Sequence, residues 1–515
     1  MNSKLLYLTL SLGLFTGCDD FLDVQPVGKL IPTQVEEFEN ILNNPKIVEN
    51  YYFVNNNGGS FLGNLGDNVY ISENSATYDY TNLHPALDRY AAYTFKQPYM
   101  DPLNPDYFWD MGIYYSAGLF NNVIEGVNSV DGKSEYSKQI IAQATAGRAW
   151  GYLTAGLLYG PMYDPNGAND TKTIPYRLAG DPTVGNPGLS TTAELFDQVW
   201  EDIAYALENA PENVANPCRF NKAAVQALAA YYYMFKRDWE NMYKYADMAW
   251  NSSLKNNGKV DNMIYNMKDF YYRQDSQAHP HEGTDAEVEL ELLGPDNLLI
   301  QTTNREILMY RKAPNGLADY PSEEFLGLFD QDKDLRYKLF ALKALGFSQK
   351  VGNEMVDDGV VTKYYRGNKT LMTEGFSHPE LLLMRAEAAA RLGKKSQALA
   401  DLNLLRKYRY DATKGSTDLA NGSAMSDDEL LNEVLTERRR ELPSASFQRV
   451  LDLKRYILDA GKPWCKQTIE HKVGDKTFSG AVNSDLFILP VGNFAIRYNP
   501  QWGLQMDERP WNPKG

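Results

Sequence analysis

Apolar residues recur at steps of three and four along several long stretches of the chain, which is the spacing of an amphipathic helix. Between Ser137 and Tyr159 the stripe consists of Ala142, Ala146, Ala149, Trp150, Leu153 and Leu157. A second stripe runs from Asn221, a favourable N-cap residue, to Phe235, and a third begins at Trp239. The pattern predicts long helices in all three places.

The same spacing returns in the C-terminal half of the chain. It ends at Gly393, a residue that suits a helix C-terminus, and resumes at Ala398 after Ser396, a favourable N-cap. Two further helices are predicted at about Asp427–Leu442 and Ser446–Asp459. Alanine at the contact positions lets antiparallel helices approach closely. Each predicted hairpin is about 30 residues long, near the roughly 34-residue period of tetratricopeptide repeats. A mainly α fold of stacked helical hairpins is therefore predicted.

Three stretches before, between and after the predicted helices have a different composition. Residues 51–106 are rich in Asn, Gly and Tyr and lack a helical period. Residues 261–377 mix turn clusters with short strand-like runs such as Glu287–Leu292, where polar and apolar residues alternate. Residues 461–515 contain a predicted short strand at Phe487–Leu489. Because long irregular segments on a rigid frame commonly carry binding residues, we expect the ligand-binding residues in the first two stretches.

The composition narrows the function classes. The chain has 515 residues and a net charge of −16, and it contains no long basic run. Binding to nucleic acid or to anionic lipid surfaces is therefore disfavoured, because both carry negative charge. Its 35 Tyr and 8 Trp residues combine an apolar ring with a polar group, which suits wet, stacking surfaces as well as a core. The sequence leaves open whether Cys218 and Cys465 form a disulfide or remain two buried thiols.

The first residues resemble an export signal. Lys4 precedes an apolar run over Leu5–Leu14, which suits a secretory signal but is too short to span a bilayer. The segment Phe15–Cys18 looks like a bacterial lipobox, so we predict a lipoprotein signal peptide at residues 1–17 and lipidation of Cys18. Acyl chains at this position would anchor the protein to a membrane without spanning it. The alternative is an ordinary signal peptide that is cleaved near a chance cysteine.

Several blocks, in the same order along the chain, resemble the SusD/RagB (starch-utilisation) family of outer-membrane lipoproteins from Bacteroidetes. The blocks are Cys18, Phe21–Pro26, Glu37–Asn43, Arg148–Trp150, Leu158–Gly160, Leu381–Gly393, Ala398–Arg406, Leu430–Leu442, Val450–Tyr456, Phe487–Pro490 and Asn499–Gln501. No single block is decisive, but the set extends over nearly the whole chain after the signal peptide.

This resemblance implies a mainly α fold in which about four tetratricopeptide-like helical hairpins pack against a variable, loop-rich subdomain with a few short strands. It also implies that residues 18–515 form a single unit. We expect the helical frame at about 107–260 and 378–460, the variable ligand-binding loops at about 51–106 and 261–377, and a C-terminal segment at 461–515.

The resemblance also implies a function. Members of the family bind oligosaccharides at the cell surface, cover a TonB-dependent transporter of the SusC type, and are not enzymes. We therefore predict a surface-exposed, outer-membrane lipoprotein that captures glycan and delivers it to such a transporter, with no cofactor. Because some members bind peptide-derived nutrients, capture of peptide or glycopeptide is an alternative. A glycoside hydrolase of helical architecture is another.

Motifs for catalysis or metal binding are absent or incomplete in the sequence. Gly126–Ser134 resembles a phosphate-binding loop, but five residues separate its glycines where four are needed. His279 and His281 lie close to Glu282 on a predicted loop without helical spacing, so we interpret them as a solvated turn. Neither Gly-x-Ser-x-Gly nor His-Glu-x-x-His occurs. We predict no catalytic residue and no metal site.

Six charged residues of the last two predicted helices have the spacing of ion pairs along and between helices. We interpret them as a scaffold rather than as a charged active cleft. They are Glu437, Arg438, Arg440, Glu441, Asp452 and Arg455.

Two segments combine aromatic rings with side chains that bond to hydroxyl groups, and a sugar ring requires both. The candidate ligand-binding residues of the first segment are Tyr78, Tyr80, Asn82, His84, Arg89, Tyr90 and Tyr93. Those of the second segment and its continuation are Tyr271, Tyr272, Arg273, Tyr310, Arg311 and Tyr320. The alternative is that these tyrosines pack the variable subdomain onto the helices, which would leave a scaffold without a ligand.

Overall fold

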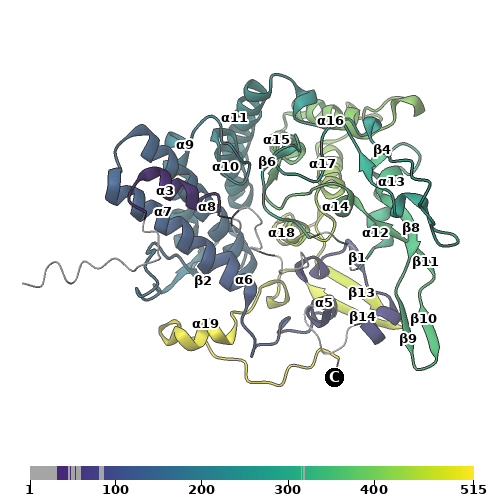
Figure 1. Cartoon of the computed structure of the whole chain (residues 1–515), viewed down its shortest axis with the longest axis horizontal. Coiled ribbons are helices and arrows are strands. Elements are labelled where there is room, and N and C mark those ends of the chain that lie inside the picture. Colours follow the sequence, from purple (N-terminus) through teal and green to yellow (C-terminus); the bar gives the residue numbers. More distant parts are fainter. Residues whose placement is uncertain are drawn as a thin grey trace, which may run out of the picture.

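A computed structural model of the chain describes residues 32–44, 47, 53, 60–79, 86–314, 316 and 319–514. Long helices from the first half of the chain lie on one side of the molecule, and helices from the second half lie beside them. Several of the short strand pairs lie along the opposite edge (Figure 1). The predicted mainly α fold is confirmed for the described residues.

The first side of the molecule is built from long helices that pack against their neighbours in the chain, α7 on α8, α8 on α9, and α10 on α11. The helices of this side are α3 (Val35–Ile41), α7 (Ser116–Asp131), α8 (Glu135–Tyr159), α9 (Thr192–Asn209), α10 (Lys222–Lys236) and α11 (Trp239–Asn257). Gly147 lets α7 and α8 approach closely, since a Cβ there would lie 2.4 Å from Phe120 Cζ. The helices predicted in this half are confirmed, and the Asn221 side chain caps α10 by accepting the Ala224 N–H at 2.8 Å.

The second half of the chain supplies α15 (His378–Arg391), α16 (Lys395–Arg409), α17 (Asp427–Glu441) and α18 (Phe447–Tyr456). The helices predicted here are confirmed, including the helix end near Gly393, whose φ of +70° is left-handed. The predicted N-cap Ser396 is wrong, because α16 begins at Lys395 with Lys394 as its N-cap. The Ala398 N–H already bonds to the Lys394 carbonyl at 3.1 Å, so Ser396 lies inside the first helical turn.

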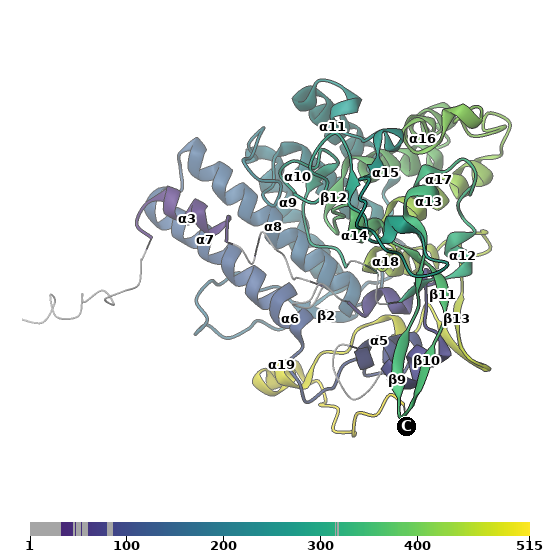
Figure 2. The same cartoon turned by 45° about the vertical axis from the view of Figure 1, so that its right-hand side comes forward.

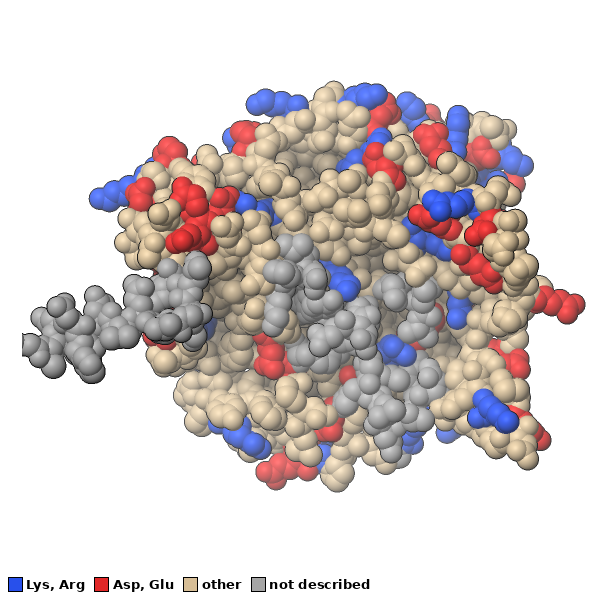
Figure 3. Space-filling view, viewed as in Figure 1, with Lys and Arg blue, Asp and Glu red and all other residues tan. Residues whose placement is uncertain are grey.

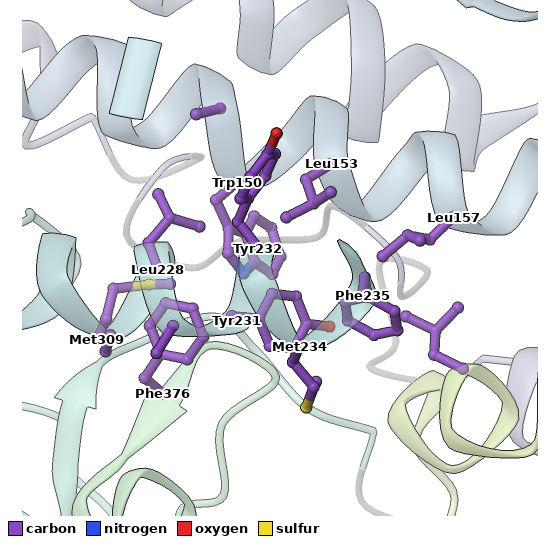
Figure 4. Close-up of a cluster of buried hydrophobic side chains, with 14 of the residues drawn as sticks. Trp150, Leu153, Leu157, Leu228, Tyr231, Tyr232, Met234, Phe235, Met309 and Phe376 are labelled. Carbon is purple, nitrogen blue, oxygen red and sulfur yellow. The ribbon is translucent and has the colours of Figure 1, made fainter. Parts of the chain in front are cut away.

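The main core lies where α10 packs between α8 and a short strand pair, β6 (Ile307–Met309) with β12 (Phe376–Ser377). Figure 4 shows Trp150 of α8, Tyr231 of α10 and Phe376 of β12 in this core. The rings of Tyr231 and Phe376 meet edge to face with centroids 5.4 Å apart. Because burying one such side chain stabilises a fold by about 1.5–3 kcal/mol, this core ties the two halves of the chain together.

The strands of the described residues pair two by two, in antiparallel register. Besides β6 with β12, the pairs are β1 (Val69–Tyr70) with β7 (Tyr320–Pro321), β2 (Lys172–Pro175) with β3 (Leu189–Thr191), β4 (Tyr271–Tyr272) with β5 (Leu292–Leu293), β8 (Ala341–Leu345) with β11 (Val360–Tyr364), β9 (Ser348–Val351) with β10 (Glu354–Asp357), and β13 (Thr468–Val473) with β14 (Lys476–Ala481). The β9–β10 pair continues the β8–β11 pair into a long hairpin that extends from the body in both views (Figure 1, Figure 2).

Shorter helices connect these parts. They are α5 (Ala86–Tyr93), α6 (Tyr107–Trp109), α12 (Glu323–Leu326), α13 (Leu335–Phe340), α14 (Arg366–Lys369) and α19 (Asn493–Tyr498). The helix α5 lies within residues 51–106, where no helix is predicted from periodicity. Its eight residues form about two turns, which is too short for a repeating pattern to show.

The strand predicted at Glu287–Leu292 is wrong. Ala286–Val288 forms a 3₁₀ turn, and only Leu292 of the predicted strand pairs, as the first residue of β5. Leu290 and Leu292 are buried whereas Glu289 and Glu291 are exposed. The alternation therefore reflects one buried side of an irregular segment and not a paired strand.

The strand predicted at Phe487–Leu489 is also wrong. Asp485–Phe487 forms a 3₁₀ turn, because the Ser484 hydroxyl accepts the Leu486 N–H and starts the turn. Phe487 and Leu489 are nevertheless buried, so their apolar character is explained by packing.

Three further findings concern the cysteines, membrane-spanning helices and metal-ligand groups of the described residues. Cys218 and Cys465 are both free thiols, which answers the question left open by the sequence. Within the described ranges, no helix combines the length and the apolar composition needed to cross a membrane. Among the same residues, no group of three or more His, Cys, Asp and Glu side chains is arranged to hold a metal ion. The predicted signal peptide and Cys18 lie outside the described residues.

Candidate ligand-binding site

A buried network of ion pairs forms the scaffold behind the site. Glu441, at the end of α17, accepts hydrogen bonds from Arg336 Nη1 at 2.9 Å and from Arg409 Nε at 3.0 Å. It also pairs with Arg366. Glu437, one turn earlier, lies 2.6 Å from Arg336 Nη2. Burial alone raises the pKa of Glu437, but the guanidinium groups around it outweigh that effect and lower the pKa to about 2.

The same helix continues the network towards its neighbours. Arg438 joins Glu380 of α15, at 3.0 Å, to Asp452 of α18, at 3.1 Å. Arg455 joins Asp452 to Glu387, at 2.8 and 2.5 Å. The predicted ion-paired scaffold is confirmed, and these pairs fix α15, α17 and α18 relative to one another. Breaking such a pair leaves one buried charge without a partner, which is strongly destabilising.

A second branch of ion pairs reaches strand β1. The Asp67 carboxylate accepts hydrogen bonds from Arg449 at 2.7 and 2.8 Å and from Lys466 at 2.6 Å. Arg439 also lies 3.1 Å from this carboxylate. Burial alone raises the pKa of Asp67, but the three cations lower it well below its ordinary value. Because Asp67 comes two residues before β1, the scaffold holds that strand in place.

The strands β1 and β7 border an open pocket of about 170 Å³ at the base of the long hairpin. We call it the β1–β7 pocket, and it is lined by Tyr70, Ile71, Ser72, Ser75, Asp319, Tyr320, Gly346, Phe347 and Lys363. Tyr70 and Tyr320 are directly opposite each other in the strand pair, with ring centroids 6.2 Å apart and an interplanar angle of 35°. Tyr70 is 38% exposed, so part of its ring is accessible from solvent.

Asp358 holds one wall of the β1–β7 pocket in position. Its carboxylate accepts hydrogen bonds from the Ser72 hydroxyl at 2.5 Å, the Tyr320 hydroxyl at 2.6 Å and Asn74 Nδ2 at 2.9 Å. The Tyr320 hydroxyl in turn accepts the Phe347 N–H at 2.5 Å. These bonds connect β7 to both strands at the base of the hairpin, so the Tyr320 ring is fixed before any ligand binds.

Lys363 of β11 supplies the cation that lines the pocket. Its Nζ lies 5.7 Å from the centroid of the Tyr320 ring. Burial lowers the pKa of Lys363, and the nearby Asp358 opposes this effect only in part. Accessible aromatic rings beside hydrogen-bonding groups are the combination that a sugar ring requires, because rings stack on its apolar face and polar groups bond to its hydroxyls.

Several predicted ligand-binding residues lie at or beside this pocket. Tyr320 lines it, and Arg89 Nε lies 3.8 Å from Asp319, which also lines it. Tyr90 packs behind the pocket against the cluster that contains Ile71. Tyr78 is half-buried in a single π-helical turn, Ser75–Asp79. The predicted residues Tyr80, Asn82 and His84 lie outside the described residues.

Three other predicted residues are buried. Tyr93 is stacked on His471 with ring centroids 4.1 Å apart. Tyr310 is 6% exposed and Arg311 is 1% exposed. The Arg311 guanidinium lies 5.3 Å from the centroid of the Trp150 ring and donates to the Cys218 carbonyl at 2.9 Å. We leave these three residues out of the proposed site, because their side chains hold elements of the fold together.

The second predicted segment lies on β4, apart from the residues that line the β1–β7 pocket. Tyr271 is 60% exposed. The Tyr272 hydroxyl donates to the Leu339 carbonyl, and Arg273 pairs with Glu291 at 2.9 Å. Only Tyr271 of this group therefore offers an accessible ring.

Tyr70, Ser75 and Lys363 line the pocket but are missing from the residues predicted from sequence. The alternation of Val69, Tyr70 and Ile71 is a weak signal of a short strand with Tyr70 on its outer face. A lysine between β-branched and aromatic residues at Val360–Tyr364 is another such signal. Neither signal places these residues beside Tyr320, since that requires the pairing of distant segments.

A larger hollow of about 390 Å³ lies between the α10–α11 hairpin and residues 301–308. Its lining is rich in amides, among them Asn256, Asn257 and Gln301, and contains no Phe, Tyr or Trp. Asn257 Nδ2 is already bonded to the Ser253 carbonyl at 2.9 Å. Without an aromatic surface this hollow is the weaker candidate for binding a sugar ring.

The surface charges do not suggest a polyanionic partner. On the face in Figure 3, Lys and Arg alternate with Asp and Glu, mainly around the rim of the described residues. This distribution agrees with the net charge of −16. A nucleic-acid backbone would require a continuous basic surface.

Two family models match the chain in separate regions. A model of the SusD family matches residues 376–499. A second model, described as "Starch-binding associating with outer membrane", matches residues 20–234. No curated protein sequence matches the chain.

Solved structures with the same fold cover nearly the whole chain. A SusD superfamily protein from Bacteroides thetaiotaomicron VPI-5482 has a TM-score of 0.59 at 18% identity, over 91% of this chain and 98% of its own. A SusD superfamily protein from Bacteroides fragilis has a TM-score of 0.61 at 18% identity, over 92% and 99%. A SusD-like carbohydrate binding protein from Bacteroides vulgatus ATCC 8482 has a TM-score of 0.55 at 17% identity, over 91% and 97%. Identities this low show the shared fold alone. The two family models, at either end of that fold, identify the family: the chain belongs to the SusD/RagB family.

Proposed function

We propose that this protein captures oligosaccharides at the β1–β7 pocket and does not alter them. The observation that carries the proposal is the pair of facing rings, Tyr70 and Tyr320, at the mouth of an open pocket with polar groups beside them. The family description as starch-binding and outer-membrane associated supports a glycan ligand, as does the carbohydrate-binding relative from Bacteroides vulgatus.

The proposal places the protein on the outer membrane, anchored by acyl chains on Cys18 after removal of residues 1–17. A TonB-dependent transporter of the SusC type is the proposed partner that receives the glycan. The physical logic is mass action, because a binding protein of modest affinity raises the ligand concentration beside the transporter. An open pocket with a few contacts suits this role, since the ligand must also leave.

A role without catalysis agrees with the state of the pocket carboxylates. Asp358 accepts three hydrogen bonds from neutral groups, and Asp319 accepts one from Asn64 Nδ2 at 2.8 Å. A glycosidase needs two carboxyl groups that are free to act as acid, base or nucleophile on either side of the scissile bond. Both carboxylates here are engaged in holding the pocket together.

The test is isothermal titration of the full lipid-free chain with a panel of glycans and a peptide mixture. Tyr70→Ala removes an accessible ring whose hydroxyl bonds to none of the described residues, and should weaken glycan binding by about 5- to 10-fold. Tyr498→Ala is the matched control, because Tyr498 is 73% exposed on α19, away from the pocket. Binding unchanged in Tyr70→Ala would contradict the site. Heat from peptides alone would favour peptide capture, and new reducing ends would show a hydrolase.

Tyr271→Ala tests whether the second predicted segment belongs to the same binding surface. If glycan binds at the β1–β7 pocket alone, this variant should bind as the unaltered protein does. A loss similar to that of Tyr70→Ala would extend the surface to β4.

A further inference from the structure

The polar groups of the β1–β7 pocket divide into those that are engaged and those that are not. Asp358 accepts its three hydrogen bonds, and the Tyr320 hydroxyl both donates to Asp358 and accepts from Phe347. The Ser72 hydroxyl likewise donates to Asp358 and accepts the Ser75 N–H at 3.1 Å. Both hydroxyls have thus given their only proton to Asp358, so neither can donate to a ligand in the present arrangement.

The groups that remain are two hydroxyls and one ammonium. Among the described residues, none is a hydrogen-bond or ion-pair partner of the Tyr70 hydroxyl, the Ser75 hydroxyl or Lys363 Nζ. An ammonium can only donate, and it has three protons to donate. The free capacity of the pocket therefore favours a ligand group that accepts hydrogen bonds.

The surroundings of Lys363 make its unpaired charge costly. The side chain is half-buried in β11, and its contact with the Tyr320 ring satisfies the charge only on one side. Asp358 is near enough to act on the charge but is not within ion-pair distance in the structure. The other pocket carboxylate, Asp319, is paired with Arg89 at 3.8 Å. A partly desolvated charge without an acceptor is unfavourable, and an anionic ligand would remove that cost.

We infer that the ligand of the β1–β7 pocket is a glycan with an anionic substituent, a carboxylate or a sulfate, which Lys363 binds. The substituent accepts charge-assisted hydrogen bonds from the ammonium, while the sugar ring lies against Tyr70 and bonds to the Ser75 hydroxyl. This inference rests on the proposed function, since it specifies the class of glycan at the same site.

The experiment uses glycan pairs that differ only in charge. One pair is tetragalacturonate and its fully methyl-esterified form, and the other is a sulfated galactan oligosaccharide and its desulfated form. We expect the unaltered protein to bind one anionic member at least about 10-fold more tightly than its neutral twin, the effect of hydrogen bonds to a charged group. That preference should shrink as the NaCl concentration rises from 50 to 500 mM. The glycan pair that shows the preference identifies the substituent: the galacturonate pair indicates a carboxylate, and the galactan pair indicates a sulfate.

Lys363→Met removes the charge and keeps most of the apolar stem, and it should abolish the preference for the anionic twin. Lys363→Arg should retain it, because the charge is kept, and unchanged binding of the neutral twin by Lys363→Met shows that its loss of preference is not a folding defect. Lys343→Met is the matched control, because Lys343 lies on the paired strand β8 and bonds to Thr362 on the opposite face. It makes the same change in net charge outside the pocket, and the preference should remain.

The outcomes separate the inference from the proposed function. Equal or weaker binding of both anionic twins, with binding that still depends on Tyr70, would overturn the inference and leave the proposed function standing. A preference that persists in Lys363→Met would overturn the role of this lysine. If no glycan of either charge binds, both the proposed function and the inference fail.

Discussion

The helical frame and the β1–β7 pocket treat buried charge in opposite ways. In the frame, the Arg336, Arg366 and Arg409 guanidinium groups converge on one carboxylate, Glu441. At the pocket, Lys363 has an aromatic ring beside it, but no carboxylate of the described residues lies within ion-pair distance. These guanidinium groups and their carboxylate find their partners inside the chain. A charge left without one marks a place where a partner from outside fits.

The frame also contains a contrast of its own. Glu437 and Glu374 are both buried, but the pKa of Glu437 is about 2 and that of Glu374 is raised to about 8. Burial raises both values, and only Glu437 has guanidinium groups that reverse the effect. Glu374 accepts a hydrogen bond from the Ser446 hydroxyl, a neutral donor, at 2.6 Å. Pairing, and not burial, therefore decides which charges stabilise the frame.

The largest effect is expected from removing the carboxylate on which three guanidinium groups converge. Glu441→Ala should lower the free energy of unfolding by about 3–5 kcal/mol, because it leaves buried charges unpaired. Urea unfolding of the full chain measures this. Asp428→Ala is the control in the same helix, since Asp428 pairs with Lys462 at the surface and should cost at most about 1 kcal/mol. If both variants lost the same free energy of unfolding, buried ion pairs of the frame would stabilise the fold no more than surface pairs do, and the comparison would fail.

Acid should weaken the frame next. The pKa of Glu437 falls from an ordinary value of 4.5 to about 2 on folding, because Arg336 and its neighbours outweigh the effect of burial. A lowered pKa stabilises the folded state above pH 4.5, and that contribution is lost as the pH falls towards 2. Glu387, which pairs with Arg455, behaves in the same way. Urea titrations between pH 5 and 2 should show a loss of about 2–3 kcal/mol per group. A constant stability over that range would contradict the assignment.

Glu374 should give the opposite pH dependence. Burial keeps its proton up to about pH 8, whereas the unfolded chain releases it near pH 4.5. Its contribution to the free energy of unfolding therefore falls as the pH rises from 4.5 to 8. Glu374→Gln should remove that slope, so that the stability of the variant relative to the unaltered protein rises by about 3–4 kcal/mol between pH 5 and pH 8, as measured by urea unfolding. Glu354→Gln, on the exposed strand β10, should leave the slope unchanged.

The smallest global effect is expected at the pocket wall. Asp358→Ala removes the acceptor of three hydrogen bonds at a partly exposed position, and should lower the free energy of unfolding by about 1 kcal/mol. The local effect should be larger, with faster hydrogen exchange of the β8–β11 amides and weaker glycan binding. Asp357→Ala is the neighbouring control, since the Asp357 carboxylate accepts only the Gly359 N–H, at 2.9 Å, among the described residues. Slower exchange in Asp358→Ala would refute the role of this carboxylate as the fixing point.

The sequence predicts the helical half of the molecule well, because helix signals are local. The stripes at Ser137–Tyr159 and Asn221–Phe235 and the turn at Gly393 each lie within a few turns of one segment, and each is confirmed. The ion-paired scaffold of α17 and α18 can also be predicted from the sequence, because its charges are spaced along two helices that are adjacent in the chain. The strand signals at Glu287–Leu292 and Phe487–Leu489 fail, because a strand exists only where a distant partner accepts its hydrogen bonds.

The candidate site is less accessible to sequence reasoning for the same reason. Tyr320 is among the predicted residues and lines the pocket, and Arg89 lies beside it. Tyr310 and Arg311 have the same residue types but lie in the core. A tyrosine carries both an apolar ring and a polar group, so its sequence context does not tell whether it faces solvent or packs against a helix.

The sequence alone determined the local elements and the composition of the protein. These are helical hairpins with paired charges, an acidic net charge and tyrosine-rich segments between the helices. What only the tertiary structure decided is which of those tyrosines meet. Tyr70 and Tyr320 are separated by about half of the chain and face each other through a two-residue strand pair. That pairing is held by Asp67 on the scaffold and Asp358 at the hairpin. A site assembled from such distant segments depends on contacts that have no local signal, because their energy arises only once the helices between them have packed.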